Sequence, residues 1–163
     1  QMVDKFKRYV KDITIATDMI VGFPTETELQ FQDSLHLIQD VKPDVLNIAR
    51  FSARSNTVAA RMKQLPGHIK KERSRALTEL FNNIALKQNK KWVGWQGKII
   101  IDEIGKNDTF IGRNFAYRPV IVKGNFSLGD EVDAKIKDAT AYDLRADALD
   151  VPEIEVNVEK NFT

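Results

Sequence analysis

Residues 112–124 read Gly112-Arg-Asn-Phe-Ala-Tyr-Arg-Pro-Val-Ile-Val-Lys-Gly124, and residues 128–140 read Leu-Gly-Asp-Glu-Val-Asp-Ala-Lys-Ile-Lys-Asp-Ala-Thr. Both runs contain short, partly alternating apolar stretches bounded by glycine, which is typical of strands joined by turns. Further glycines at positions 97 and 105 extend this spacing toward the N-terminus. The pattern predicts a small antiparallel barrel with five strands, near 95–104, 109–113, 117–123, 130–137 and 141–145.

Four polar side chains stand together at a predicted loop-to-strand junction: Arg113, Asn114, Tyr117 and Arg118. Two guanidiniums, an amide and a phenol suit the holding of phosphates and stacking on unpaired bases. We predict that these four residues, with Lys123, contact RNA. Trp92 and Trp95 admit two interpretations, stacking on bases or packing at a domain junction.

This motif and strand spacing resemble the TRAM domain over roughly residues 92–145. TRAM domains are small β-barrels that several tRNA-modifying enzymes carry to bind RNA. The resemblance implies a five-stranded antiparallel barrel with tRNA, rather than DNA, as its partner.

Composition excludes several classes of protein. No apolar run in the 163 residues approaches the roughly 20 needed to span a membrane, and no signal-peptide pattern is present. We therefore expect a cytoplasmic protein without a membrane partner. The sequence has no cysteine, and its two histidines, His36 and His68, are far apart. These features predict neither a disulfide nor a metal site.

Positive charge is concentrated ahead of the predicted barrel. Residues 60–98 carry ten basic and two acidic side chains, whereas residues 99–163 carry eight basic and thirteen acidic ones. Such a block is either a solvated helix face or a surface for phosphates. Because it adjoins the RNA-binding motif, we predict phosphate contacts from Lys70, Lys71, Arg73, Arg75, Lys87, Lys90 and Lys91.

The N-terminal part predicts a βαβ unit with a parallel sheet. Apolar, β-branched residues predict strands at 13–22 and 45–51. Thr25 and Glu28 have the spacing of a capping box, which places a helix at roughly 26–40. A short helix is predicted at 57–64 and a long one at 69–91. The resulting division is an α/β region at 1–66, a basic linker helix at 67–91, an all-β domain at 92–147, and an edge strand or tail at 148–163.

Two motifs in this part resemble the methylthiotransferase branch of the radical S-adenosylmethionine enzymes. The first is Thr17-Asp-Met-Ile-Val-Gly-Phe-Pro-Thr-Glu26, and the second is Phe51-Ser-Ala-Arg-Ser-Asn-Thr-Val-Ala-Ala60. In the second, Ala53, Ser55, Asn56 and Val58 replace three prolines and a glycine of the usual motif. The linker at 71–81 is similar to the archaeal and eukaryotic type that methylthiolates threonylcarbamoyladenosine beside the tRNA anticodon.

The resemblance implies that this chain is a C-terminal part of such an enzyme, with an incomplete βα-barrel end. The whole enzyme uses S-adenosylmethionine and two [4Fe–4S] clusters, whose thiolate ligands are absent here. We therefore expect no cluster on this chain and no activity from it alone. The resemblance places the cofactor's adenine end at Val21, Gly22, Phe23, Pro24, Arg50, Phe51 and Ser52. The same residues also suit a plain strand end and helix cap without a ligand.

Two further hypotheses belong to other classes. One is a non-catalytic TRAM-type RNA-binding protein or RNA chaperone. The other assigns residues 1–66 to oligomerisation, because an open parallel edge predicts a homodimer. The Gly-Phe-Pro turn and its βαβ unit favour the enzyme, since a stand-alone RNA binder has no use for half a barrel.

Overall fold

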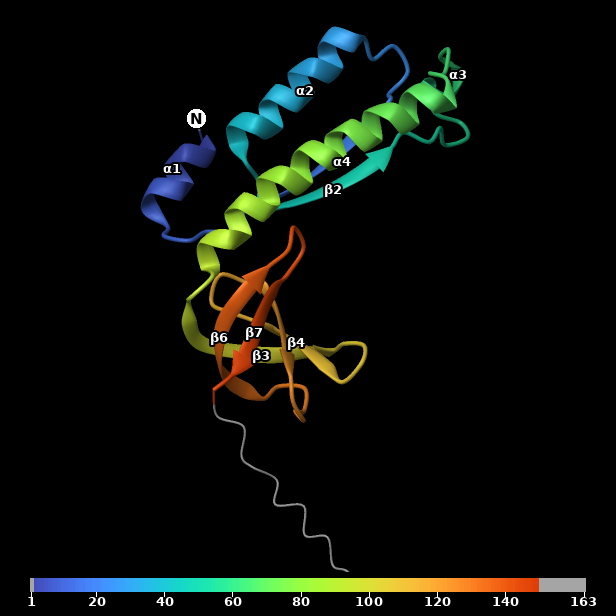
Figure 1. Ribbon diagram of the computed structural model, residues 1–163. Coiled ribbons are helices and arrows are strands. Elements are labelled where there is room, and N and C mark those ends of the chain that lie inside the picture. The colour runs from blue at the N-terminus through green and yellow to red at the C-terminus, as the bar shows by residue number, and fades with distance from the viewer. Residues whose placement is uncertain (1, 150–163) are drawn as a thin grey trace, which may run out of the picture.

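The computed structural model describes residues 2–149 and arranges them as two units that meet at the end of one long helix (Figure 1). The first unit contains β1 (Ala16–Val21), α2 (Glu28–Val41) and β2 (Val45–Arg50). The two strands pair in parallel, from Ala16 opposite Val45 to Val21 opposite Arg50. The predicted βαβ unit is therefore present, and α4 (Gly67–Asn89) packs on it together with α2.

Apolar side chains from both strands and both helices fill the space between them. This core consists of Val21, Phe31, Ile38, Leu46, Leu77, Phe81 and Ala85. Other apolar side chains of the sheet remain accessible, since Ile20 is 60% exposed and Val45 is 42% exposed. A parallel sheet is normally covered on both faces, so this two-stranded sheet has an unusually open surface.

The capping box of α2 lies two residues further along the chain than predicted. The Thr27 hydroxyl accepts a hydrogen bond from the Gln30 amide, and the Gln30 side chain accepts one from the Thr27 amide. Thr25 instead adopts a left-handed conformation with φ 76° inside the preceding turn. The prediction of Thr25 and Glu28 as the box was wrong because both pairs have equivalent spacing, and the turn geometry decides between them.

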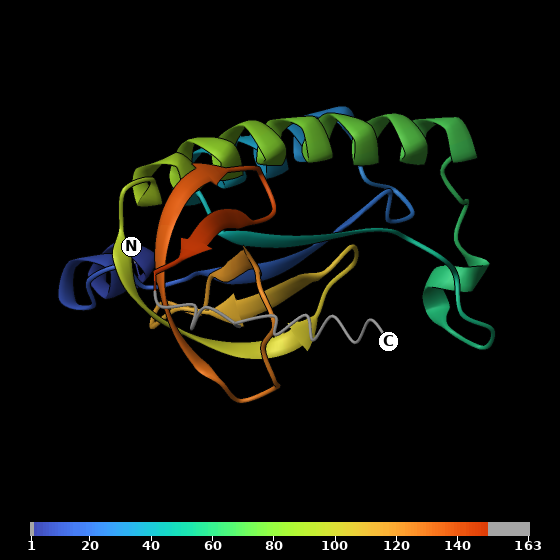
Figure 2. The same cartoon turned by 60° about the horizontal axis from the view of Figure 1, so that its bottom comes forward.

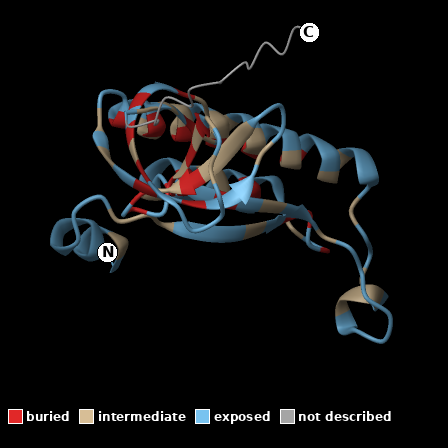
Figure 3. Cartoon of the chain, turned by 90° about the horizontal axis from the view of Figure 1, so that it is seen from below, coloured by how far each residue is buried: buried red, intermediate tan, exposed pale blue. Residues whose placement is uncertain are grey.

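Two short helices lie at the edges of the first unit. α1 (Met2–Tyr9) does not follow from the sequence patterns above, and α3 (Val58–Arg61) is shorter than predicted. Neither contains a buried residue, and α3 projects at the end of the molecule opposite the barrel (Figures 2 and 3). Within residues 2–149, no helix is both long and apolar enough to cross a membrane.

The second unit is a closed barrel of five strands, reached from α4 through the 3₁₀ helix η1 (Lys90–Trp92). The strands have the order β3-β4-β5-β7-β6 around the ring. Their bounds are Gln96–Ile104 for β3, Thr109–Arg113 for β4, Pro119–Lys123 for β5, Glu131–Ala139 for β6 and Leu144–Ala148 for β7.

One strand pair departs from the predicted antiparallel arrangement. β5 and β7 run in parallel, with Val120 opposite Leu144, whereas every other neighbouring pair in the barrel is antiparallel. A ring with an odd number of strands cannot alternate in direction all the way round, so one parallel pair is unavoidable. The predicted fold class, an α/β region with a linker helix and a five-stranded barrel, is otherwise confirmed.

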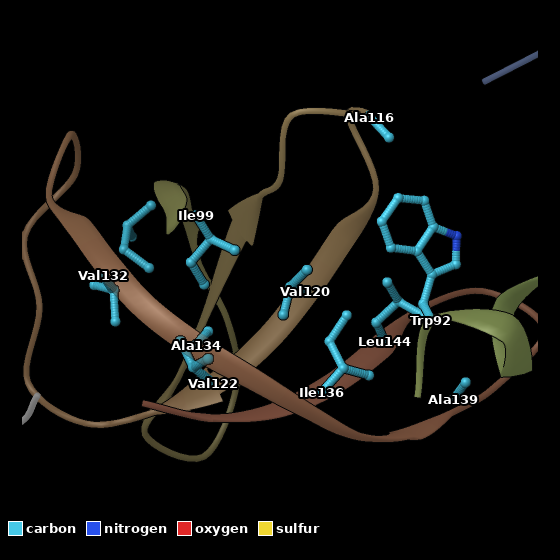
Figure 4. Close-up of a cluster of buried hydrophobic side chains, with 11 residues drawn as sticks. Trp92, Ile99, Ala116, Val120, Val122, Val132, Ala134, Ile136, Ala139 and Leu144 are labelled. Carbon is cyan, nitrogen blue, oxygen red and sulfur yellow. The ribbon is translucent and has the colours of Figure 1, made fainter. Parts of the chain in front are cut away.

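Alternating side chains fill the barrel interior. Ile99 and Ile101 point inward and are almost fully buried, while Ile100 between them is 51% exposed. Further interior side chains are Val120 and Val122 from β5, Val132, Ala134 and Ile136 from β6, and Leu144 from β7 (Figure 4). The strand or tail predicted beyond residue 148 falls, from residue 150 on, outside the described residues.

Candidate nucleic-acid interface

The loop between β4 and β5 is a tight turn organised by Asn114. Its side-chain oxygen accepts hydrogen bonds from the amides of Ala116 (3.1 Å) and Arg118 (3.0 Å). Its carbonyl accepts a third from the amide of Tyr117, which has a left-handed φ of 61°. Asn114 itself is buried, and the turn it holds leaves Phe115 and Tyr117 68% and 70% exposed. Exposed aromatic rings on an ordered loop are suited to stacking on unpaired bases.

Arg113 supports one of these rings. Its guanidinium lies over the Tyr117 ring at 5.1 Å, and its Nε donates to Asp102 at 2.8 Å. A cation held over one face of an aromatic ring orients that ring and leaves the other face available. The predicted pair Arg113 and Tyr117 is thus brought together at the surface.

Phe115 joins the loop to the two tryptophans. Its ring centroid lies 5.7 Å from that of Trp92 and 6.2 Å from that of Trp95. Trp92 is buried, whereas Trp95 is partly exposed. We call Trp95, Phe115 and Tyr117 the aromatic face. Phe115 is not among the residues predicted from the sequence to contact RNA, although its position within the turn indicates that it projects outward.

Arg118 lies at the junction of the two units rather than on the surface. Its guanidinium forms an ion pair with Asp44 and donates to Asn89 Oδ1 at 3.0 Å. It also lies 5.9 Å from the centroid of the Trp92 ring, and the residue as a whole is 7% exposed. Its three partners therefore come from the α2–β2 corner, the end of α4 and the η1 helix that leads into the barrel.

Further hydrogen bonds tie the two units together around this ion pair. Asp44 also accepts from the Ile15 amide at 2.8 Å and from Gln88 Nε2 at 3.1 Å. The Thr14 hydroxyl donates to the carbonyl of Ala116 at 2.6 Å. The turn that carries the aromatic face is therefore anchored directly to the first unit.

The seven basic residues predicted to contact phosphates lie on α4 or, for Lys90 and Lys91, on η1, and they fall into three settings. Arg73 is buried and pairs with Glu26 at 2.5 Å and Glu28 at 3.2 Å, which fixes α4 to the start of α2. Lys70 donates to the carbonyl of Phe51 at 3.2 Å. The side-chain amide of Gln32 and then Arg73 lower the pKa of Glu28. The other five basic residues are exposed. Lys71 and Arg75 lie near the start of α4, and Lys87, Lys90 and Lys91 lie near the barrel.

Lys123 is separated from the other predicted barrel residues. It pairs with Thr109 at one end of the β4–β5 hairpin, whereas Arg113 pairs with Pro119 at the other end. The structure therefore does not bring Lys123 to the aromatic face, and a contact of Lys123 with RNA stays a prediction.

The predicted cofactor residues lie at the carboxyl ends of β1 and β2. Phe23 and Phe51 contact edge to face at 5.0 Å, and Phe23 is 45% exposed. The Gly22 amide donates to Glu26 Oε2 at 2.7 Å, and a Cβ at Gly22 would overlap the Lys70 side chain. Val21 and Pro24 are buried, while Arg50 and Ser52 are exposed.

These residues fit one part of the cofactor set and not another. Phe23, Phe51 and the exposed strand end offer an aromatic surface of the kind that an adenine ring contacts. The iron–sulfur clusters require thiolates, and the sequence has no cysteine. Within residues 2–149, no group of three or more His, Cys, Asp or Glu side chains is placed to hold a metal ion.

The chain thus combines a small closed five-stranded β-barrel with part of an α/β fold. Residues 91–149 match the family model of the TRAM domain. This part of the chain is therefore a TRAM domain, as the sequence predicted.

Over most of its length the chain is related to the tRNA methylthiotransferases. A probable threonylcarbamoyladenosine tRNA methylthiotransferase of Archaeoglobus fulgidus is 46% identical over 138 residues, covering 85% of this chain and 32% of the relative. One from Pyrococcus horikoshii is 37% identical, covering 91% of this chain and 35% of the relative. A tRNA-2-methylthio-N(6)-dimethylallyladenosine synthase of Aquifex aeolicus is also 37% identical, with coverage of 93% and 34%. The chain thus spans about a third of the length of these curated relatives.

Proposed function

We propose that this chain is the tRNA-holding part of a methylthiotransferase that acts on N6-threonylcarbamoyladenosine next to the anticodon. The observation that carries the proposal is the Asn114 turn, which holds Phe115 and Tyr117 exposed beside Arg113. Exposed aromatic rings beside a guanidinium suit the stacking of unpaired bases and the binding of their phosphates.

The names of the relatives support the substrate. The most similar of those described above, at 46% identity, is named for threonylcarbamoyladenosine, and the relative named for dimethylallyladenosine reaches 37%. A stand-alone RNA chaperone is not favoured, because similarity to the enzymes extends over 85% of the chain and so includes the α/β unit.

In the whole enzyme, S-adenosylmethionine would supply the methyl group and the radical chemistry. We propose that Phe23, Phe51, Arg50 and Ser52 bind its adenosine end, while Val21, Gly22 and Pro24 shape the strand end beneath it. Support comes from their shared position at the carboxyl ends of two parallel strands. The test is to measure S-adenosylmethionine binding by a longer chain that includes the cluster ligands. If the adenosine contacts residues elsewhere in that chain, the proposal is wrong.

Stacking on the aromatic face can be tested by removing one ring at a time. Tyr117→Ala and Phe115→Ala should each weaken binding of a tRNA anticodon stem-loop by about 1–3 kcal/mol. Because no charge is lost, the dependence of affinity on salt should hardly change. The measurement is a salt titration of the dissociation constant for wild type and both variants.

Tyr142→Ala is a matched control. Tyr142 is 67% exposed, close to the 70% of Tyr117, but it lies in the β6–β7 turn and takes part in none of the ring contacts of the aromatic face. Its loss should leave affinity unchanged. Wild-type affinity in both test variants, or an equal loss in Tyr142→Ala, would remove the aromatic face from the function.

A further inference from the structure

A continuous groove leads from α2 and α4 to the junction with the barrel. One section, of about 500 Å³, lies between these two helices and includes Lys42, Lys87 and Lys91 in its lining. The other section, of about 540 Å³, reaches the barrel at Trp95. The two sections share Lys42, Gln88 and Lys91, so they form one channel, which we call the lysine groove.

The lysine groove is positively charged. Lys42, Lys87 and Lys91 are exposed, and none of them takes part in the ion pairs found within residues 2–149. The groove is lined by two acidic residues, and one of them, Asp44, is paired with Arg118. Lys7 also lines the groove, and its ammonium donates to the carbonyls of Val41 (2.6 Å) and Lys42 (3.2 Å). Four lysines therefore face one remaining carboxylate, that of Asp12.

Lys42 occupies a position where the fold alone favours glycine. It is the C-cap of α2 and adopts the left-handed conformation, with φ 48° and ψ 64°. Helices commonly end in this conformation with glycine, because glycine adopts it without steric cost. A lysine held there in a less favourable backbone conformation points to a role for its charge.

The groove is continuous with the aromatic face. Trp95 lines the groove and contacts the Phe115 ring at 6.2 Å, and Phe115 lies two positions before Tyr117. Cations that follow a groove toward stacking aromatics match a polynucleotide, in which phosphates run alongside the bases. An acidic peptide would need the cations but would leave the adjoining exposed rings without a role.

We propose that the lysine groove binds the sugar–phosphate backbone of the RNA whose unpaired bases stack on the aromatic face. Lys42, Lys87 and Lys91 are its phosphate contacts. This inference rests on the proposed function, since it extends the same RNA from the barrel onto the first unit.

Lys42→Gly removes the charge of Lys42 without an expected loss of stability, so it separates an effect on RNA binding from an effect on folding. Removing the Cβ relieves the left-handed position, so the melting temperature should stay the same or rise. The affinity for RNA falls as salt rises, and the slope is that of the logarithm of affinity against the logarithm of salt concentration. Losing one phosphate contact should lower the size of this slope by about 0.9. The ratio of the variant's dissociation constant to that of wild type should accordingly fall roughly threefold between 50 and 200 mM salt. Lys87→Ala should show the same change in slope.

Lys106→Ala is the control, because Lys106 precedes Thr109 at the end of the β4–β5 hairpin remote from Arg113. It removes the same charge and should leave the slope unchanged. If Lys42→Gly and Lys87→Ala bind tRNA with the wild-type slope, the groove is not the backbone site. If both lysine variants change the slope while Tyr117→Ala binds with wild-type affinity, the groove is supported as the backbone site. Base stacking on the aromatic face is then refuted. If a polyglutamate peptide displaces bound tRNA as effectively as unlabelled tRNA does, the groove is not specific for RNA and the proposal is wrong.

Discussion

Arg118 illustrates how a residue can belong to an RNA-binding motif and yet face protein. Its two terminal nitrogens bond Asp44 and Asn89, which are 74 and 29 positions away in sequence. A lysine has no planar fork and can satisfy at most one of these partners well. Arg118→Lys should therefore lower the free energy of unfolding by about 1–3 kcal/mol. Urea denaturation measures this change.

Binding data on the same variant separate positioning from direct contact. If Arg118 positions the loop, Arg118→Lys should weaken RNA binding together with stability, at an unchanged salt slope because the charge is kept. Arg113→Lys is the matched control, since Arg113 pairs with Asp102 outside the junction and should cost less stability. Weaker binding with wild-type stability would instead indicate that Arg118 contacts RNA directly.

The sequence located the motif but not the direction of each side chain. Of the residues predicted to contact RNA, Arg113 and Tyr117 reach the surface, while Asn114, Arg118 and Arg73 are buried. Their burial depends on partners remote in sequence: Asp44 for Arg118, and Glu26 for Arg73. No local pattern around a basic residue reveals a carboxylate dozens of positions away, so composition alone overstates the number of free cations.

At the scale of elements, periodicity predicted most of the regular structure, and packing decided the rest. The α2, α4 and barrel-strand positions follow from apolar spacing and turns, within a few residues. The capping box of α2 was misplaced because Thr25 and Thr27 offer equivalent spacing. The parallel β5–β7 pair follows from ring closure, a property of the whole barrel that no single strand contains.

The open β1–β2 sheet supports a prediction about association. Its strands have unpaired edges, and Ile20 and Val45 expose apolar surface. We propose that this chain, on its own, forms a homodimer that covers this surface. Light scattering should give twice the chain mass, and Ile20→Lys should shift the protein to monomer without lowering its helix content. A wild-type monomer across micromolar concentrations would contradict the proposal.

At the scale of the whole molecule, α4 separates the two regions that we propose to act on one RNA. The predicted cofactor residues lie near its first turns, where the Lys70 side chain lies against Gly22 and donates to the Phe51 carbonyl. The barrel lies at the other end of α4 (Figure 2). The 23 residues of α4 span roughly 34 Å. An RNA held at the aromatic face therefore has to extend along α4 to reach the proposed site of chemistry.

Substitutions of the exposed cations at the two ends of α4 should consequently affect binding of short and long RNAs differently. Lys71 and Lys91 are roughly 30 Å apart along the helix axis. For a minimal hairpin that reaches from the aromatic face only to the near end, Lys91→Ala should lower the salt slope by about 0.9, and Lys71→Ala should have no effect. For full-length tRNA, both variants should lower the slope, and the double variant should lower it by the sum, because sites this far apart act independently. Salt titrations with the two RNAs provide the comparison. Equal sensitivity of the hairpin to both substitutions would place the RNA across α4 rather than along it.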